Sequence, residues 1–129
     1  MNPSTIVEQA LFEIVCHPLH DEAQISAFFS PHYQQWVDGK SLDYAGFVAH
    51  MAKLKQITRA IHVTVLAIAS QQENVLTHHR VDVTKADGSR AQIEVFAHFV
   101  VQGGRILRCE ELTHMVAGAA EDGELGSVQ

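Results

Sequence analysis

Three ionisable residues of the sequence have side chains suited to moving protons, namely Asp38, His79 and Glu111. Alternation along an expected strand puts Glu111 on the same side as the apolar Leu107 and Cys109, so we expect its carboxyl group to face the interior. Burial of a carboxyl group favours its protonated form, which suits acid or base chemistry. Glu111 is therefore the preferred acid, although a structural hydrogen bond or an outward salt bridge would explain it equally well.

His79 shares the inward side of its expected strand with Thr77, whereas His78 lies on the opposite side. An imidazole has an ordinary pKa of about 6.5, so His79 could exchange protons at neutral pH, with Glu111 or Asp38 as its orienting partner. A hydrogen-bonded core histidine is the competing interpretation.

Asp38 stands before Gly39 at the end of a short expected strand, 33–37. Trp36 shares its side of that strand, and the alternation does not decide which side faces the interior. We expect Trp36 and Asp38 to do so, Trp36 as an aromatic wall for a flat ligand and Asp38 as a proton acceptor. The alternatives are a packing role for Trp36 and a turn role for Asp38.

Further contacts to a small organic ligand are expected from the inward sides of other elements. They come from a helix and from two strands, and they are Phe47, His50, Ala97, Phe99 and Cys109. His50 is placed either at the rim of the pocket or in solvent. The pocket described in this way is mostly apolar, so we expect a small apolar ligand.

Histidines are plentiful, but their spacing does not indicate a metal site. His78 and His79 are adjacent on a strand and point to opposite faces, so they cannot easily bind one ion. The sequence contains no His-Glu-x-x-His or Cys-x-x-Cys motif and no glycine-rich phosphate loop before a helix. We therefore expect neither a metal nor a cofactor, and we expect Cys16 and Cys109 to be buried free thiols.

Local patterns predict a helical first part and a strand-rich second part. Apolar residues at helical spacing predict helices over 5–16, 21–29 and 43–57. Thr5 with Glu8 resembles a capping box, and Asp21 and Asp43 are expected N-caps. Runs of strand-forming residues between short turns then predict an antiparallel meander, with strands at 61–69, 75–84, 90–101 and 105–114.

The strand expected at 90–101 carries Phe96 and Val100 on the side opposite to its inward residues. Apolar side chains gathered on an exposed face mark association surfaces. We therefore expect a homodimer that forms through the outer face of the sheet, with His98 in the interface.

Length and composition set the class of protein. The 129 residues fit one domain, expected over 1–116, and small and acidic residues predict a flexible tail at 117–129. The net charge is −6 and the nine Lys and Arg residues form no run, which argues against a nucleic-acid partner. No stretch approaches the roughly 20 apolar residues that span a bilayer. Since signal-peptide features are also absent, we expect a cytoplasmic protein without membrane contact.

Two short motifs and the element order resemble a known superfamily. Phe28-Phe29-Ser30-Pro31 leads into Tyr33-Gln34-Gln35-Trp36, and a Gly-Gly-Arg-Ile turn at 103–106 leads into the last strand. Residues from about 5 to 115 thereby resemble the nuclear transport factor 2-like superfamily, in particular its SnoaL-like members, related to polyketide cyclases and ketosteroid isomerases. The resemblance implies an α+β, cystatin-like cone with three N-terminal helices packed on a strongly curved antiparallel sheet.

The isomerase branch of that superfamily implies a carboxylate base at the end of the first strand, with a tyrosine and a second acid in an oxyanion hole. Asp38 lies at the base position or one residue beyond it. Ala97 takes the position of the second acid, and the first expected helix has no tyrosine. Steroid-type isomerase chemistry is therefore disfavoured.

Two functions stay open at this point. The first is a cofactor-free enzyme that isomerises, cyclises or dehydrates a small apolar carbonyl compound, with Glu111, Asp38 and His79 moving protons. The second is a non-catalytic, dimeric ligand-binding protein. The residues that would distinguish them are spread over several strands rather than gathered into one motif.

Overall fold

The chain begins with helices and continues into four long strands. In the computed structural model, residues 2–119, 122 and 125–128 are described. The helical elements are α1 (Pro3–Ala10), the π-helical turn η1 (Leu11–Val15), α2 (Glu22–Phe28) and α3 (Tyr44–Ile57). The strands are β1 (Phe29–Val37), β2 (Lys40–Asp43), β3 (Thr58–Gln71), β4 (Asn74–Lys85), β5 (Arg90–Gln102) and β6 (Arg105–Ala117). The short strand β2 was not expected from the sequence.

Within the described residues the strands form one six-stranded sheet, in the order β2-β1-β6-β5-β4-β3. β3 to β6 pair antiparallel, as the predicted meander requires. β1 runs parallel to β6, with Gln35 opposite Cys109 and Val37 opposite Glu111. The prediction of a purely antiparallel sheet is therefore wrong for the pair of β1 and β6. The reason is that the chain returns from β1 to β6 through α3 and the rest of the sheet rather than through a hairpin.

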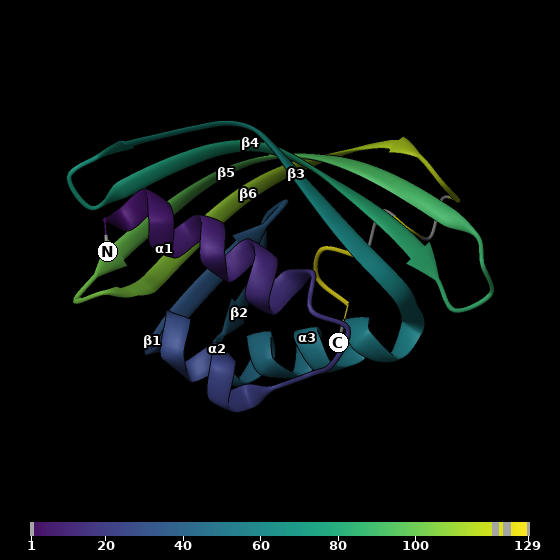
Figure 1. Ribbon diagram of the computed structural model, residues 1–129, viewed down its shortest axis with the longest axis horizontal. Coiled ribbons are helices and arrows are strands. Elements are labelled where there is room, and N and C mark those ends of the chain that lie inside the picture. The colour runs from purple at the N-terminus through teal and green to yellow at the C-terminus, as the bar shows by residue number, and fades with distance from the viewer. Residues whose placement is uncertain (1, 120–121, 123–124, 129) are drawn as a thin grey trace.

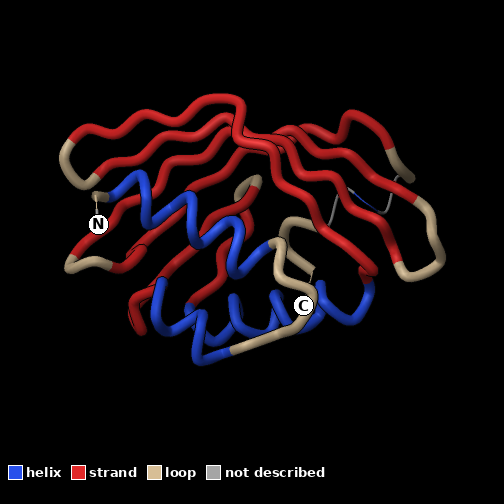
Figure 2. The backbone as a smooth tube through the Cα atoms, in the orientation of Figure 1, coloured by secondary structure: helices blue, strands red, loops and turns tan. Residues whose placement is uncertain are grey.

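The helices cover one face of the sheet. Figure 1 shows α1, α2 and α3 on the same side of the strands, and Figure 2 shows the same two layers in blue and red. The α+β class, with three helices on one sheet, is thus confirmed. The strong curvature expected for the sheet is not confirmed. The interior of the protein lies between the helical layer and this face of the sheet.

Short polar side chains begin the helices. Asp21 accepts hydrogen bonds from the amides of Ala23 and Gln24, and Asp43 accepts one from the Gly46 amide, so both predicted N-caps are confirmed. The predicted capping box at Thr5 is wrong. Asn2 is the N-cap of α1 instead, because its Oδ1 already accepts the Thr5 amide at 2.9 Å.

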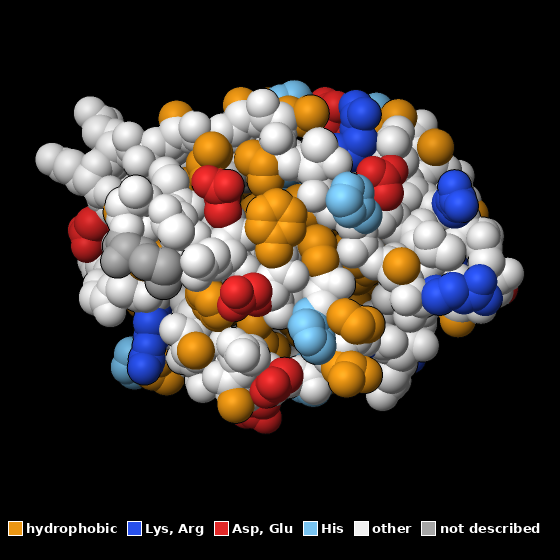
Figure 3. All heavy atoms as spheres, viewed as in Figure 1, with side chains coloured by type: hydrophobic (Ala, Val, Ile, Leu, Met, Phe, Trp, Pro, Cys, Tyr) orange, Lys and Arg blue, Asp and Glu red, His pale blue; other side chains and the backbone are white. Residues whose placement is uncertain are grey.

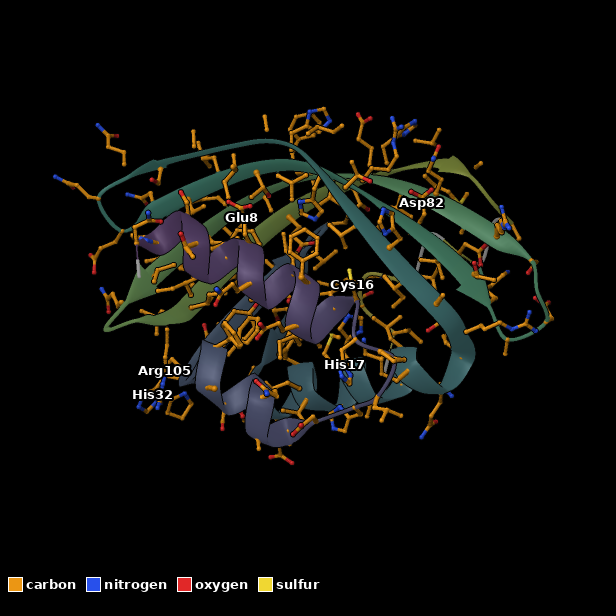
Figure 4. All side chains as sticks on the ribbon, in the orientation of Figure 1. Glu8, Cys16, His17, His32, Asp82 and Arg105 are labelled. Carbon is orange, nitrogen blue, oxygen red and sulfur yellow. The ribbon has the colours of Figure 1, made fainter. Side chains whose placement is uncertain are left out.

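The first helix changes its winding midway, where a single α-helix was predicted. The Cys16 amide donates to the Leu11 carbonyl at 3.1 Å, one residue further back than in an α-helix. Lys55 Nζ donates to the carbonyls of Ile14 and Val15 at 2.9 and 2.6 Å, which satisfies oxygens that the helix end leaves without amide partners. Cys16 lies at this end of the helical segment (Figure 4).

An aromatic cluster joins β1 to α3 in the interior. Ring centroids are 4.8 Å apart for Phe29 and Tyr33, 4.7 Å for Phe29 and Phe47, and 4.9 Å for Tyr33 and Phe47. All three side chains are at most 4% exposed. Edge-to-face and tilted rings at these distances are favourable, so the cluster fixes α3 against the sheet.

This cluster predicts a large loss of stability for Phe29→Ala. Removing a fully packed phenylalanine should lower the free energy of unfolding by about 3–5 kcal/mol. Phe12 is 49% exposed, so Phe12→Ala should cost about 1 kcal/mol or less and serves as the control. Urea unfolding of both variants measures the difference, and equal losses would contradict the central role of the cluster.

Candidate functional site

A cavity of about 120 Å³ lies between the helices and the inner face of the sheet. Most of its wall is apolar and is contributed by every layer of the fold. The apolar lining is Leu11, Val15, Phe47, Met51, Leu54, Ile61, Val63, Val81, Val83, Ile93, Val95, Met115 and Leu125. An apolar wall of this kind suits a small organic molecule.

Among the described residues, six polar side chains interrupt this apolar wall. They come from β1, α3, β4, β6 and the segment after β6, and they are Gln35, His50, His79, Glu111, Thr113 and Asp122. Few polar groups in an apolar cavity can fix the orientation of a ligand and give it specificity. The predicted inward direction of His79 and Glu111 is confirmed, since both line the cavity.

Glu111 is held in the cavity wall by its neighbours on β6 and β1. Cys109 Sγ donates to Glu111 Oε1 at 3.4 Å, and the Asp38 amide donates to the Glu111 carbonyl at 3.0 Å. The pKa of the Glu111 carboxyl group is raised to about 7, mainly by burial; the Cys109 hydrogen bond opposes the shift, and the nearby Asp38 charge adds to it. At neutral pH Glu111 can therefore either donate or accept a proton.

Two buried side chains near Glu111, Tyr33 and Cys109, donate hydrogen bonds. Tyr33 donates to Gln35 Oε1 at 2.8 Å, and Gln35 lies opposite Cys109 in the parallel pair. Burial, followed by the charges of neighbouring groups, raises the pKa of both Tyr33 and Cys109 well above their ordinary values. The phenol and the thiol therefore stay protonated at neutral pH and orient Gln35 and Glu111.

The two cavity histidines are neutral at neutral pH. Burial, with a further contribution from His78, lowers the pKa of His79 to about 4, and His79 Nδ1 lies 2.9 Å from Thr77 Oγ1. Burial also lowers the pKa of His50, whose Nδ1 donates to the Val128 carbonyl at 2.6 Å. Proton exchange by His79 near pH 6.5 is therefore not supported, because its interior position disfavours the imidazolium.

Asp38 does not line the cavity, although the sequence favoured an inward carboxylate. It occupies the turn between β1 and β2 with a φ of 50°, and its neighbour Gly39 has a φ of 84°. The carboxylate accepts a hydrogen bond from the Thr113 amide at 2.9 Å and another from the Thr113 hydroxyl. The turn interpretation thus describes its position, and Asp38 contacts the cavity wall from outside, through Thr113 and the Glu111 backbone.

Trp36 was expected in the pocket, and the structure places it on the outer face of the sheet. The Arg108 guanidinium lies 4.6 Å from the centroid of its ring, and both side chains line a shallow hollow on that face. The side of β1 was predicted wrongly because the register puts Gln35 inward and Trp36 outward. Alternation then excludes Trp36 from the cavity.

The other predicted ligand contacts divide into two groups. Phe47 and His50 line the cavity. Ala97, Phe99 and Cys109 are buried on the inner side of β5 and β6, but they pack in the core instead of lining the cavity.

Several cavity residues were missed from the sequence. Thr113 could have been found, because it shares the side of β6 that carries Glu111. Asp122 and Leu125 could not, because they follow β6 in a stretch of small and acidic residues with no periodicity. The predicted flexible tail, 117–129, also includes residues outside the described part, namely 120–121, 123–124 and 129.

No group of three metal-binding side chains occurs among residues 2–119, 122 and 125–128. In the same part of the chain, no helix is long and apolar enough to cross a membrane. Lysine and arginine side chains are scattered over the face drawn in Figure 3 and do not form a basic patch there.

Comparison with known proteins agrees with this arrangement. Residues 9–109 match the SnoaL-like domain. An uncharacterised protein of Schizosaccharomyces pombe is 32% identical over 109 residues, which cover 84% of each chain. The structure of IdmH, a proposed polyketide cyclase from Streptomyces antibioticus, has a TM-score of 0.74 at 15% identity, covering 88% of this chain and 92% of the other.

A second structural neighbour is an epoxide hydrolase of Mycobacterium tuberculosis, with a TM-score of 0.72 at 16% identity, covering 87% of this chain and 82% of the other. Such likenesses show the fold, which is that of the nuclear transport factor 2-like superfamily. Within that class, the match over most of the sequence shows that the chain belongs to the SnoaL-like domain family.

The raised pKa of Glu111 predicts a specific pH dependence of stability. Between pH 4.5, its ordinary pKa, and about 7, the folded chain keeps a proton on Glu111 that the unfolded chain has lost. Stability should therefore fall as the pH rises through this window. Glu111→Gln removes that loss, so the variant should gain stability relative to the natural chain above about pH 7.

Urea unfolding from pH 4 to 8 measures this effect. Glu110→Gln makes the same chemical change on the outer face, where the Glu110 side chain is 53% exposed, and should leave the slope unchanged. Parallel pH profiles for the natural chain and Glu111→Gln would show that the Glu111 carboxyl group has an ordinary pKa.

Proposed function

We propose that the protein is a cofactor-free enzyme that isomerises, cyclises or dehydrates a small, mostly apolar carbonyl compound. The observation that carries this proposal is Glu111, an ionisable side chain in the wall of an apolar cavity with a pKa of about 7. Such a group has both protonation states available at neutral pH, which general acid–base catalysis needs. Membership of the SnoaL-like family supports a small-molecule ligand.

In the simplest reaction, Glu111 shifts a double bond. The ionised carboxylate takes a proton from the carbon between a carbonyl and an alkene, and the electrons of that C–H bond form a conjugated enolate. Glu111 then returns the same proton to the far end of the system, so no oxidant or cofactor is consumed. Gln35 and the neutral His79 also line the cavity and supply polar contacts to the carbonyl oxygen.

Asp38 contributes to this mechanism through space. Its carboxylate is engaged by Thr113, and its charge helps to raise the pKa of Glu111. A raised pKa makes the Glu111 carboxylate a stronger base for the first proton transfer of a double-bond shift. We therefore assign proton transfer to Glu111 alone, with His79 as a neutral polar contact and Asp38 as an electrostatic one.

The test is isomerisation of 3-cyclohexen-1-one to 2-cyclohexen-1-one, followed by the ultraviolet absorption of the conjugated product. Glu111→Gln should lower the rate by about 10²–10⁴-fold, because the glutamine side chain cannot take the proton. Glu110→Gln, the matched change on the outer face, should retain the natural rate. Equal rates for Glu111→Gln and the natural chain would remove Glu111 from the mechanism.

A second candidate is a non-catalytic, dimeric ligand-binding protein. It is favoured by the position of Asp38 outside the cavity and by the engagement of the other described cavity carboxylate, Asp122, with Lys85 and the Ala119 amide. The outer face of the sheet adds a reason to expect a dimer, because Leu76, Phe96 and Leu112 are exposed on it. Charges of both signs flank them, with Arg108 and Glu110 paired at 2.7 Å, so the face can be self-complementary.

Leu112→Glu tests the dimer. A carboxylate in the middle of an apolar interface would lose its hydration without a partner, so the variant should be monomeric where the natural chain is dimeric. Leu19→Glu is the control, since Leu19 and Leu112 are both 70% exposed but Leu19 lies before α2, away from the sheet. Sedimentation equilibrium measures the mass, and a natural chain that is monomeric at high concentration contradicts the dimer.

A further inference from the structure

Residues that follow β6 form part of the cavity wall. Asp122, Leu125 and Gly126 line the cavity, and Leu125 is buried. Figure 1 shows the last stretch of the chain turning back between the end of α1 and α3, under the sheet. The cavity is therefore bounded on this side by the C-terminal segment, which we define as Asp122 and residues 125–128.

A buried ion pair holds one end of the C-terminal segment. The Asp122 side chain is 3% exposed, and its carboxylate accepts a hydrogen bond from Lys85 Nζ and another from the Ala119 amide, each at 2.9 Å. These contacts lower the pKa of Asp122, with the Lys85 hydrogen bond as the largest cause. Release of this end would break both contacts, so it is disfavoured.

The other end of the C-terminal segment is held by α3 and β1. The Val128 carbonyl accepts a hydrogen bond from His50 Nδ1 at 2.6 Å, which links the segment to α3. Gly126 lies so close to β1 that a Cβ atom there would be 3.0 Å from Val37 Cγ1. With the ion pair, three separate contacts keep Leu125 inside the cavity.

We propose that the C-terminal segment sets the size of ligand that the site accepts, with Leu125 as the residue that determines specificity. This proposal rests on the proposed function in requiring that a small molecule binds in the cavity. The open space beside Leu125 is about 120 Å³. An apolar protein cavity of roughly 150 Å³ holds one benzene ring, so the site accepts a compound with one ring and excludes fused rings.

The polar groups of the cavity agree with a compact ligand. The His50 Nδ1–H is taken by the Val128 carbonyl, and the Asp122 carboxylate is taken by Lys85 and Ala119. The Thr113 hydroxyl donates to the Asp38 carboxylate, so the other polar groups beside the open space are Gln35, His79 and Glu111, which lie on the sheet. One carbonyl group on the ligand is enough to form hydrogen bonds with these side chains, and the apolar part of the ligand contacts α3 and Leu125.

The experiment compares a one-ring with a two-ring ketone, cyclohexanone and 2-decalone. Four proteins are titrated while the methyl signals of Ile61 and Ile93, which line the cavity, are followed by NMR. They are the natural chain, Leu125→Ala, a chain that stops after Gly118, and Leu112→Ala as the matched control. Leu125→Ala keeps the ion pair and the His50 contact, so it tests the proposal even if the shortened chain does not fold.

The natural chain and Leu112→Ala should bind cyclohexanone and exclude 2-decalone. In Leu125→Ala the affinity for 2-decalone should rise by about tenfold or more, because the removed carbon atoms leave space for the second ring. If Leu125→Ala still binds cyclohexanone and still excludes 2-decalone, the role of the C-terminal segment is contradicted. The proposed function is not contradicted by that result. Failure of all four proteins to bind either ketone would overturn the small-molecule function and this inference with it.

Discussion

The parallel pairing of β1 with β6 is the contact on which the cavity depends. It brings Gln35 beside Cys109 and Val37 beside Glu111, although these residues are far apart in the sequence. Because side chains alternate along a strand, a slip of one residue in this pair would turn Gln35 outward and Trp36 inward. The amide of Asp38, bonded to the Glu111 carbonyl, continues the same pairing to the end of β1. The polar side of the cavity therefore follows from one strand register.

The same pairing leaves proton transfer in the cavity to one side chain, Glu111. Burial keeps Tyr33 and Cys109 protonated and His79 neutral, so these side chains contribute dipoles and hydrogen bonds without charge. Glu111 differs because its pKa lies close to neutrality. A wall with many charges would attract water and ions, whereas this wall can surround an apolar ligand and still transfer a proton.

The sequence predicts those parts of the molecule that follow from local pattern. The caps at Asp21 and Asp43 and the inward sides of β4 and β6 follow from short-range hydrogen bonding and from alternation between clear turns. The side of β1 could not be predicted, because its register depends on a parallel partner about 70 residues later. Leu125 was missed for a related reason. One apolar residue has no periodicity, and only its contacts with distant elements show that it is buried.

The two faces of the sheet share the same strands, and this limits how the chain can change in length. β6 contributes Glu111 to the cavity, while the neighbouring Glu110 and Leu112 face outward. A residue inserted within β6 would exchange these sides and destroy the cavity wall and the outer face together. An insertion at the hairpin turn of Gly103 and Gly104 changes neither face. We therefore expect insertions to be tolerated at this hairpin turn and to be disruptive between Glu110 and Leu112.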